Sequence, residues 1–393
     1  MPKARVVTLT AGAASAVVRG HPWIWRQGLS RAADGAEMGD VVEIRDAGGA
    51  VLGQGLWDPS SPLAVRLYAR TALPKVDEAF ITTLVAQAIR RRDPLAADPN
   101  TTAYRLCNGE GDRVPGVVID RYDHVAVLRL DGDAIGAWLK RLTPLLGELL
   151  RGAGVRSVAH RIPGRSGEGR LEPLSGDPPP DSLTVRENGI AMVVDVARGQ
   201  KTGAFLDQRD NRARVRELAA NRRVLNLFSY AGGFSTAAAL GGATHVTSVD
   251  IAQSAHGTAQ RSMRENGVDS VGHAFVTADA FAFLGTALAR KEKWDLVISD
   301  PPSFAPNEKA KQRALVAYRR LHAACSAVLA EGGVFCASSC SSHVNAEDFL
   351  TTLDDASLAG RSMSLVGMFG HPYDHPTLAG WPEGRYLKFA VLR

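Results

Sequence analysis

The chain of 393 residues has no apolar run close to the roughly 18 residues that a membrane span needs. Its N-terminus also lacks the layout of a signal peptide, because Lys3 and Arg5 are followed only by a short mixed stretch. These two absences predict a cytoplasmic protein that has no membrane partner.

Cysteine is scarce. The chain has four: Cys107, Cys325, Cys336 and Cys340. They form no Cys-x-x-Cys pair and no disulfide framework, which agrees with a reducing cytoplasm. A zinc site built from Cys340 and His343 with His371 or His375 matches no usual zinc spacing, so we predict no metal.

A strong excess of charge is also absent, since the net charge is only +5. The basic residues are nevertheless clustered. Residues 1–31 carry five of them and no acid, and residues 198–223 carry eight against three acids. Such clusters favour a polyanion as partner. On charge alone, a solvated charged face is an equally good interpretation.

The first 182 residues predict two small domains. Residues 1–72 form the β-rich one, with short strands at 41–44, 51–55 and 64–68. Residues 73–182 form an α+β middle domain, which has helices over 76–93 and 133–152 and a hairpin over 114–130. Residues 163–180 contain nine Pro or Gly out of eighteen and predict a loop or linker.

From residue 183 to residue 393 the pattern changes to alternating strands and helices, which is typical of a parallel α/β sheet. The predicted strands are 224–228, 245–250, 275–277, 296–299 and 334–338. Residues 363–369 and 386–392 are expected to add an antiparallel pair. A sheet of this kind binds its ligand at the carboxyl ends of its strands.

Three features after successive strands predict a nucleotide-type cofactor. The turn Phe228-Ser229-Tyr230-Ala231-Gly232-Gly233 follows the first strand without the Gly-x-Gly-x-x-Gly spacing of a dinucleotide site. Asp250 ends the second strand, where a carboxylate can accept both ribose hydroxyls. Asp279 follows the third and can bind an adenine amino group. The set resembles the S-adenosylmethionine site of class I methyltransferases. The alternative for both aspartates is helix N-capping.

The next two strand ends predict chemistry on a base. The fourth strand is followed by Asp300-Pro301-Pro302-Ser303-Phe304, and the fifth ends at Cys340 among serines. A thiolate that adds to carbon 6 of cytosine makes carbon 5 nucleophilic. Cys340 fits that nucleophile, and Asp300 fits the acid that donates to N3. The base that removes the proton from carbon 5 is not identified.

Both assignments have alternatives. A lone cysteine is commonly buried and inert, although the surrounding serines and His343 argue against a dry site for Cys340. In methyltransferases that act on amino groups, an Asp-Pro-Pro turn holds the exocyclic amine, usually with an aromatic residue next in the chain. Here Ser303 precedes Phe304. A thiol has no role in that reaction, so Cys340 discriminates between the two.

Over essentially its whole length the chain resembles the bacterial large-subunit (23S) ribosomal RNA 5-methylcytosine methyltransferases that carry an N-terminal PUA domain. The segments that carry the resemblance are 20–25, 39–42, 110–121, 199–212, 228–235, 300–304, 339–341, 375–376 and 382–384. The run Lys201-Thr202-Gly203-Ala204-Phe205-Leu206-Asp207-Gln208-Arg209 is the most specific. The resemblance implies a Rossmann-like class I methyltransferase domain, S-adenosylmethionine as cofactor, ribosomal RNA as partner and a possible homodimer.

The resemblance also implies further site residues. Asp207, Gln208 and Arg209 are expected beside the cofactor, and Lys201 and Phe205 beside its methionine end or RNA phosphate. Substrate contacts are expected from Pro301, Pro302, Phe304, Arg19, His21, Trp23 and Arg26. Both Trp23 and Trp25 are equally well read as core residues. Ser303 departs from the lysine or similar residue that the familiar members have there.

Three functions follow, in order of preference. The first is methylation of carbon 5 of a cytosine in large-subunit ribosomal RNA through a covalent Cys340 adduct. The second is methylation of a guanine nitrogen in ribosomal RNA, because a guanine methyltransferase family has a similar Thr-Gly-x-Phe-Leu-Asp run. The third is an RNA-binding assembly module without catalysis, against which the intact set of site residues argues.

Overall fold

The computed structural model describes residues 5–71, 75–162, 164 and 169–393. The chain divides into two compact units. The first comprises residues 1–181, 196–204 and 373–384, and the second comprises residues 182–195, 205–372 and 385–393. Both predicted N-terminal domains therefore lie within one unit. Their predicted boundary at 72/73 falls outside the described residues, as does Lys3, and the domain limits stay predictions.

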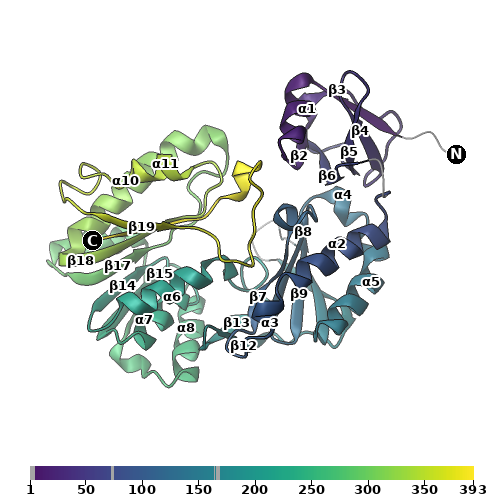
Figure 1. Cartoon of the computed structure of the whole chain (residues 1–393). Coiled ribbons are helices and arrows are strands. Elements are labelled where there is room, and N and C mark those ends of the chain that lie inside the picture. The colour runs from purple at the N-terminus through teal and green to yellow at the C-terminus, as the bar shows by residue number, and fades with distance from the viewer. Residues whose placement is uncertain (1–4, 72–74, 163, 165–168) are drawn as a thin grey trace. The chain divides into compact units, whose positions relative to one another are not determined.

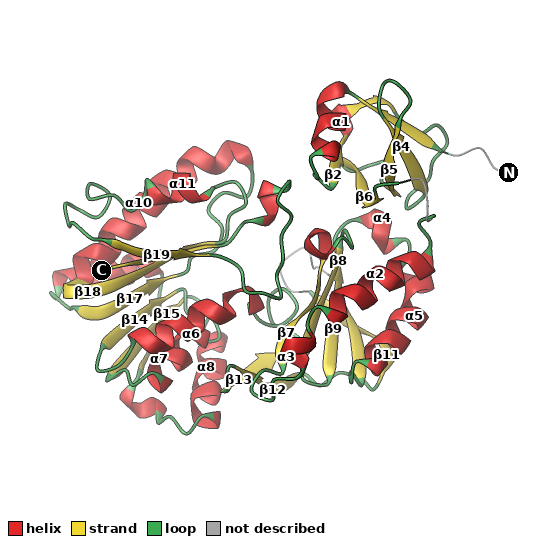
Figure 2. Ribbon diagram, in the orientation of Figure 1, coloured by secondary structure: helices red, strands yellow, loops and turns green. Residues whose placement is uncertain are grey.

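The N-terminal part of the first unit is a six-stranded sheet with the order β2-β6-β5-β4-β1-β3 (Figures 1 and 2). Its elements are β1 (Val6–Leu9), α1 (Ala11–Val18), β2 (Trp23–Trp25), β3 (Leu29–Arg31), β4 (Val41–Arg45), β5 (Val51–Trp57) and β6 (Leu63–Ala69). Alternate residues of β4, Val42 and Ile44, point into the core. A Cβ on Gly53 would lie 2.1 Å from the carbonyl oxygen of Ala69, so the close pairing of β5 with β6 requires glycine.

The second sheet of this unit has the order β11-β10-β9-β8-β7. Its strands are β7 (Ala103–Asn108), β8 (Val117–Tyr122), β9 (Val125–Leu130), β10 (Ser157–Ile162) and β11 (Arg170–Gly176). Its helices are α2 (Glu78–Arg90), α3 (Asp93–Ala96), α4 (Asp133–Gly136) and α5 (Leu139–Gly152). The long helix predicted over 133–152 is therefore two helices. The break falls at Ala137 and Trp138, which keep right-handed helical dihedrals, and the indole of Trp138 donates to the carbonyl of Gly39 at 2.7 Å.

The prediction of a loop over 163–180 is wrong for residues 170–176, which form β11. This strand lies at the edge of its sheet and pairs antiparallel with β10 alone. An edge strand tolerates Pro173 because one side of its backbone needs no hydrogen-bonding partner. Composition therefore misled the prediction at a position where the topology relaxes the rule against proline.

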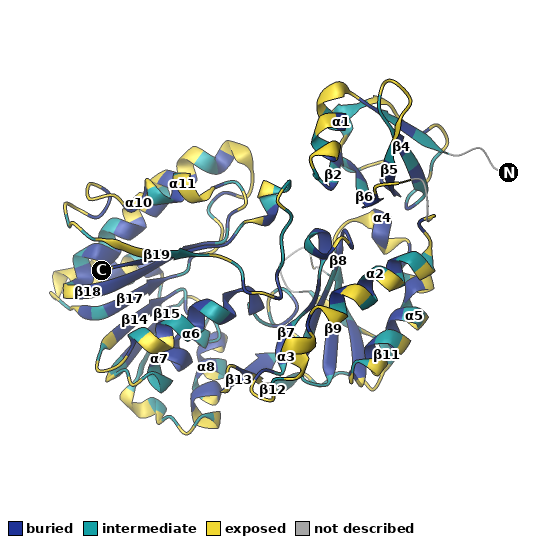
Figure 3. Ribbon diagram, viewed as in Figure 1, coloured by how far each residue is buried: buried dark blue, intermediate teal, exposed yellow. Residues whose placement is uncertain are grey.

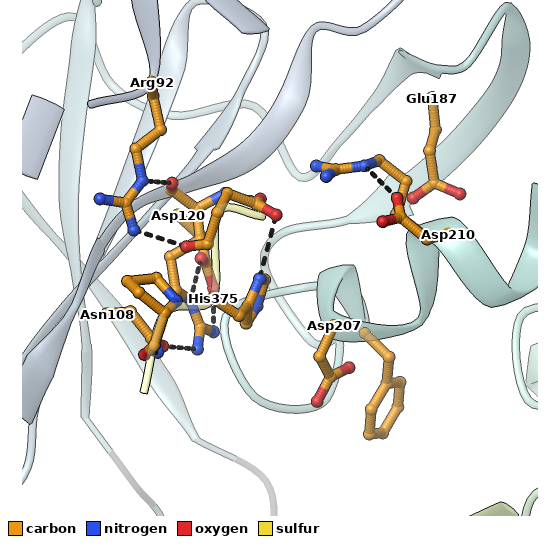
Figure 4. Close-up of polar contacts among 12 residues, drawn as sticks. Arg92, Asn108, Asp120, Glu187, Asp207, Asp210 and His375 are labelled. Atoms are coloured by element: carbon orange, nitrogen blue, oxygen red, sulfur yellow. Dashed lines mark hydrogen bonds and ion pairs between the residues drawn. The ribbon is translucent and has the colours of Figure 1, made fainter. Parts of the chain in front are cut away.

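Residues 373–384 belong to the first unit although they lie near the C-terminus, and a buried polar network holds them. Arg92 donates to both carboxylate oxygens of Asp112 at 2.7 Å and to the carbonyl of Asp374 at 2.5 Å. The Asn108 amide donates to the carbonyl of Pro376 at 2.8 Å. Figure 4 shows Arg92 and Asn108 within this network. The bonds satisfy groups that burial would otherwise leave unpaired at high cost.

The second unit contains a seven-stranded sheet with the order β16-β15-β14-β17-β18-β20-β19. Its strands are β14 (Arg223–Leu227), β15 (His245–Asp250), β16 (Ala274–Thr277), β17 (Trp294–Ser299), β18 (Leu329–Ser339), β19 (Leu365–Phe369) and β20 (Lys388–Leu392). The first five in the order pair in parallel, and β20 pairs antiparallel with both β18 and β19. The parallel sheet and the terminal antiparallel pair were both predicted.

Helices cover both faces of this sheet (Figure 1). They are α6 (Arg209–Leu218), α7 (Gly233–Leu240), α8 (Gln253–Glu265), α9 (Ala280–Ala289), α10 (Lys311–Val328) and α11 (Ala346–Leu350). Neighbouring strand residues enter separate cores: Leu225 packs with α9 and α10, whereas Val224 packs with α6 and α7. The central strands are therefore buried on both faces (Figure 3), which explains their nearly continuous apolar sequences. The predicted α/β Rossmann-like domain is confirmed.

A hairpin, β12 (Ser182–Glu187) and β13 (Ile190–Asp195), completes the second unit and turns at Asn188-Gly189. The short 3-10 helices of the chain are η1 (Arg26–Gly28), η2 (Gly109–Asp112), η3 (Leu206–Gln208), η4 (Ser270–Gly272), η5 (Glu308–Ala310) and η6 (Pro382–Gly384). Within the described ranges, every helix is too short or too polar to cross a bilayer.

Candidate active site

Five parallel strands of the second unit end at one edge of its sheet, and each end carries a predicted site residue. In sheet order these are Asp279 after β16, Asp250 at the end of β15, the Phe228–Gly233 turn after β14, Asp300 after β17 and Cys340 after β18. The parallel pairing brings residues that are far apart in sequence to a single edge, as a doubly wound sheet does at its ligand site.

The turn after β14 has an unusual backbone. Phe228, Tyr230 and Gly232 have φ values of 56°, 45° and 74°, in the left-handed region that side chains other than glycine rarely adopt. A Cβ on Gly232 would lie 2.4 Å from the Cβ of Ala259 in α8, so this position requires glycine for two reasons. Such strain persists only where the surrounding structure imposes it, often at a ligand site.

Asp250, at the end of the neighbouring strand β15, hydrogen-bonds to the backbone of this turn. Its carboxylate accepts hydrogen bonds from the backbone N–H of Tyr230 at 2.7 Å and of Ala252 at 2.8 Å. Helix α8 starts after Ala252, which receives no side-chain cap. The alternative that Asp250 is a helix N-cap is therefore wrong, and its carboxylate lies where a ribose is expected.

Asp279 behaves differently. It is the N-cap of α9, and its side chain accepts from the N–H of Ala282 at 3.0 Å. The capping alternative is thus realised for this residue. A contact between Asp279 and an adenine amino group stays a prediction.

Two residues that the sequence analysis did not single out fit S-adenosylmethionine at this edge. The buried hydroxyl of Ser229, inside the turn, has no hydrogen-bond partner within the described residues. Ile251, directly after Asp250, is 76% exposed, which is unusual for a large apolar side chain. A polar end of a ligand at the turn would give the Ser229 hydroxyl a hydrogen-bond partner, and an adenine ring beside Ile251 would cover its exposed side chain. The position of Ile251 after the ribose carboxylate was the signal available in the sequence.

The Thr-Gly-x-Phe-Leu-Asp-Gln-Arg run reaches the same edge through Gln208. Its side-chain amide donates to Asp300 Oδ1 at 3.0 Å and to Ser338 Oγ at 3.1 Å, and its Oε1 accepts from Asn211 at 2.6 Å. The structure therefore makes Gln208 a partner of the Asp300 carboxylate, a role that the sequence analysis did not predict. Direct contact of Gln208 with the cofactor stays a prediction.

The residues on either side of Gln208 in the sequence also make side-chain hydrogen bonds. The Asp207 carboxylate accepts from the Tyr386 hydroxyl at 2.8 Å, and buried Arg209 donates to Asp210 at 3.1 Å (Figure 4). The ring of Phe205 stands edge-on to Tyr230, with the ring centres 5.3 Å apart. The run therefore packs directly against the strained turn after β14.

Arg212, one turn into α6, connects this run to the β12–β13 hairpin. Its guanidinium makes two 2.6 Å bonds to Glu187 of β12 and donates to the carbonyl of Phe205 at 2.9 Å. The carboxylate beside it raises the pKa of Arg212 above its ordinary value despite burial. A planar bidentate pair between arginine and a carboxylate adds geometric specificity to its interaction energy, so it orients the guanidinium.

Cys340 differs from the other three cysteines. Cys107, Cys325 and Cys336 are 0% exposed, and burial raises the pKa of Cys325 and of Cys336 to about 12. Cys340 is partly exposed, and its Sγ lies 3.8 Å from the carbonyl oxygen of Pro301. The structure thus brings the Cys340 thiol next to the Asp300-Pro301-Pro302 turn, as the sequence predicted.

Some residues of that turn pack against the core of the second unit, and others are exposed. The ring of Phe304 packs on Tyr318 of α10, with centres 4.9 Å apart, while Pro302 and Ser303 are exposed and Pro301 is buried. The Tyr318 hydroxyl donates to Ser339 Oγ at 3.0 Å. Of the predicted substrate contacts here, Pro302 presents the most surface.

Lys388 is a third residue that the sequence analysis did not single out. It is 3% exposed at the start of β20, directly opposite Ser339 of β18. Its ammonium donates to the carbonyls of Ser341 at 2.5 Å and Tyr386 at 2.6 Å. Burial lowers the pKa of Lys388 to about 8. A lone lysine among the apolar residues of β20 was the signal in the sequence.

The first unit holds the other predicted substrate residues, and most are engaged in its own fold. Arg26 donates to the carbonyls of Asp58 and Ser61, and the Trp23 indole donates to Glu110 at 2.7 Å. His21 pairs with Glu383 at 3.2 Å, and this hydrogen bond raises its pKa. Lys201 has a left-handed backbone with φ 54°.

Trp25 and Arg19 are the more accessible of these candidates. Trp25 is 41% exposed, and exposed Arg19 donates to Ser15 Oγ at 2.6 Å. The core interpretation therefore suits Trp23 better than Trp25. RNA contacts of Arg19, His21, Trp23, Arg26 and Lys201 stay predictions.

The same unit contains a cavity of about 250 Å³. Its lining residues include Gly20, Pro22, Tyr68, Arg70, Phe80, Glu110, Arg113 and Leu378. Burial, and the charge of neighbouring Arg113, lower the pKa of Arg70. Arg70 and Arg113 thus place two guanidinium groups at the lining of this cavity, which also includes Glu110. In the part of the chain that the structure describes, no three His, Cys, Asp or Glu side chains are grouped to hold a metal.

Comparisons with known proteins agree with this geometry. Residues 156–384 match the family model of S-adenosylmethionine-dependent methyltransferases, and residues 7–70 match that of PUA-like domains. Ribosomal RNA large subunit methyltransferase I of Salmonella newport is 35% identical over 98% of this chain and 97% of that protein. The protein of the same name from Escherichia coli is 34% identical over 98% of both.

Solved structures show the same fold. A SAM-dependent methyltransferase from Streptococcus mutans superposes with a TM-score of 0.88 at 24% identity, covering 99% of each chain. A methyltransferase solved in complex with SAH matches equally well. The turn after β14, the Asp250 carboxylate and the full-length match together show that this chain belongs to the S-adenosylmethionine-dependent methyltransferase family that includes ribosomal RNA large subunit methyltransferase I.

Proposed function

We propose that this methyltransferase methylates carbon 5 of a cytosine in large-subunit ribosomal RNA through a covalent adduct with Cys340. The observation that carries the proposal is the Cys340 thiol, partly exposed at the carboxyl edge of the sheet and 3.8 Å from the carbonyl of Pro301. Methylation of an amino or ring nitrogen has no use for a thiol at that place.

The chemistry divides between the two strand ends. The Cys340 thiolate adds to carbon 6 of the cytosine ring, and the electron pair of the 5,6 double bond becomes available at carbon 5. Asp300 donates a hydrogen bond to N3 and stabilises the charge that develops on the ring. Gln208 holds the Asp300 side chain through the 3.0 Å bond to Oδ1. S-adenosylmethionine, when bound, supplies the electrophilic methyl group that carbon 5 takes up.

The cofactor is held by the turn after β14 and by Asp250. The Asp250 carboxylate accepts the ribose hydroxyls, Ile251 covers a face of the adenine, and Ser229 binds the polar methionine end. Loss of the proton from carbon 5 and expulsion of the Cys340 thiolate then restore the double bond and release the methylated base.

Ribosomal RNA as substrate rests on the full-length relatives, whose names state it, and on the PUA-like domain at residues 7–70. The cavity that Arg70 and Arg113 line supports contact with RNA phosphate, because paired guanidinium groups bind phosphate oxygens in a fixed geometry.

The test uses large-subunit ribosomal RNA transcribed with 5-fluorocytosine and incubated with the protein and S-adenosylmethionine. Fluorine at carbon 5 cannot leave as a proton does, so the adduct accumulates. We expect a protein–RNA species that survives denaturation, is absent in Cys340→Ala and is present in the control Cys336→Ala, whose thiol is 0% exposed.

Methyl transfer to ordinary RNA without any adduct on the fluorinated RNA would sink the carbon-5 mechanism in favour of a guanine nitrogen. Absence of S-adenosylmethionine binding in a titration would favour the RNA-binding module without catalysis.

A further inference from the structure

We propose that Lys388 is a positioning residue for Cys340: its ammonium holds the segment after β18 and favours the thiolate form of the neighbouring cysteine. The proposal deepens the proposed function, on which it rests for the use made of the thiol.

The contacts of Lys388 place it beside the nucleophile. It lies opposite Ser339 in the antiparallel pair β18–β20, and its Nζ donates at 2.5 Å to the carbonyl of Ser341. The residues directly before and after Cys340 are thus both held by Lys388. A second bond, to the carbonyl of Tyr386 at 2.6 Å, fixes the ammonium from its own strand. The segment carrying the thiol is therefore held by Lys388 on the β20 side, in addition to the bond from Tyr318 to Ser339.

Position alone does not explain why a lysine is used. A buried ammonium is costly, and only 3% of Lys388 is exposed. Both of its hydrogen bonds go to carbonyl groups, which a neutral donor would also satisfy. Burial pushes the pKa of Lys388 down to about 8, whereas the negative charges of Cys340 and Asp348 pull it up. A positive charge beside a thiol is the usual means of activating cysteine.

Two other titratable groups lie near this position, Asp348 of α11 and Tyr318 of α10. Asp348 of α11 already binds Lys311 of α10 at 2.6 Å. Tyr318 of α10, whose hydroxyl donates to Ser339, has its pKa raised above the ordinary value chiefly by burial, with Cys340 and Asp300 adding to it. The Asp348 carboxylate disfavours a nearby thiolate, and the neutral Tyr318 phenol contributes no charge, so the ammonium of Lys388 supplies the compensating positive charge.

The proton balance is simple. The proton that leaves Cys340 passes to water when Lys388 is already charged, or to the amine of Lys388 when it is neutral. Both routes end with an ammonium beside a thiolate. Conversion of the thiol therefore requires no metal and no further base.

The test is the pH profile of Cys340 alkylation by iodoacetamide, followed by mass spectrometry of the Cys340 peptide in the full-length protein. It needs neither RNA nor cofactor, so its failure is distinguishable from failure of the proposed methylation. In the wild type we expect the rate to rise with an inflection below about pH 8.5, the value of an ordinary thiol.

Lys388→Met is expected to move that inflection up by about one pH unit and to slow alkylation about tenfold below it, since an adjacent charge typically shifts a thiol by that much. Lys388→Arg should keep the wild-type inflection. The control is Lys311→Met, which removes an ammonium that faces Asp348 but contacts no residue next to Cys340.

An unchanged inflection in a folded Lys388→Met would overturn the proposal, as would a loss of the low inflection in Lys388→Arg. Should both variants fail to fold, the wild-type profile still decides: an inflection at or above about pH 8.5 contradicts an activated thiol.

Discussion

At the scale of single residues, the site depends on side chains that hold the reacting groups. Asp300 and Cys340 are the proposed reacting groups, and their surroundings are held by the Gln208 amide and by the Lys388 bond to Ser341. Gln208 lies in the sequence run that we expected beside the cofactor. Its amide instead spans Asp300 and Ser338. Catalysis that relies on positioned donors loses efficiency when such supports are removed.

A substitution of Gln208 measures this support. Gln208→Leu removes the donor to Asp300, and a hydrogen bond of this kind is typically worth about 0.5–1.5 kcal/mol. We expect kcat for methylation of RNA to fall by up to about tenfold, while the Kd for S-adenosylmethionine, measured by calorimetry, changes little. Ser338→Ala is the matched control, because it removes the other acceptor of the same amide and leaves the bond to Asp300. Equal losses in both variants would contradict a specific role for that bond.

At the scale of elements, the turn from β14 to α7 joins the cofactor site to the packing of the second unit. Gly232 has no side chain, so helix α8 can approach it closely. A Cβ at this position would lie 2.4 Å from the Cβ of Ala259 in α8. The positive φ values at Phe228 and Tyr230 show that this turn is shaped by its surroundings more than by its own residue preferences.

Gly232→Ala tests the turn. The added methyl group meets Ala259 and the backbone must leave φ 74°, so we expect a lower free energy of unfolding and at least about tenfold weaker binding of S-adenosylmethionine. Titration calorimetry and urea unfolding measure the two effects. The control is Gly257→Ala in α8, where a Cβ meets nothing within 4 Å; it should stabilise the protein by up to about 1 kcal/mol. Wild-type affinity in Gly232→Ala would refute the assignment.

Most elements of the second unit followed from sequence because long apolar strands alternate with amphipathic helices there. In the first unit, β11 was missed, since Pro173 and glycines imitate a loop where an edge strand tolerates them. The division of the 133–152 helix was missed for another reason. It depends on Trp138 reaching the carbonyl of Gly39, a contact 99 positions away that no local pattern reveals.

At the scale of the whole molecule, recognition of RNA is expected to rest on charge. The lining of the cavity in the first unit includes Arg70 and Arg113, and the side chain of Arg113 is exposed. Nearby Glu110 is already engaged by Arg66 and by the Trp23 indole. The two arginines therefore carry positive charge that is available to a polyanion.

The double substitution Arg70→Ala with Arg113→Ala should weaken binding of a ribosomal RNA transcript by about one to two orders of magnitude. It should also make the negative slope of log K against log salt shallower by about 1.4, because two phosphate contacts are lost. Filter binding at several salt concentrations measures both. Arg90→Ala, an exposed arginine at the end of α2 that does not line the cavity, is the control. A slope that matches the control would exclude phosphate contacts at the cavity.

The features that follow the parallel strands can be read from the sequence alone: a glycine turn, two aspartates, an Asp-Pro-Pro turn and a cysteine. Each is a local signal, because an apolar strand followed by a polar or glycine-rich turn can be read within about ten residues. Those signals predicted the parallel sheet and a nucleotide-type cofactor, and their resemblance to a known family then implied the methyltransferase fold and S-adenosylmethionine.

The side chains that hold these groups in place, in contrast, become visible only in the folded chain. Gln208 meets Asp300 across 92 positions, and Lys388 meets Ser341 across 47. Such contacts depend on how β18, β20 and η3 pack, and a lysine or glutamine in the sequence carries no mark of its distant partner. The physical reason is that burial and the placement of charge, which set the reactivity of a thiol or a carboxylate, are properties of the folded chain.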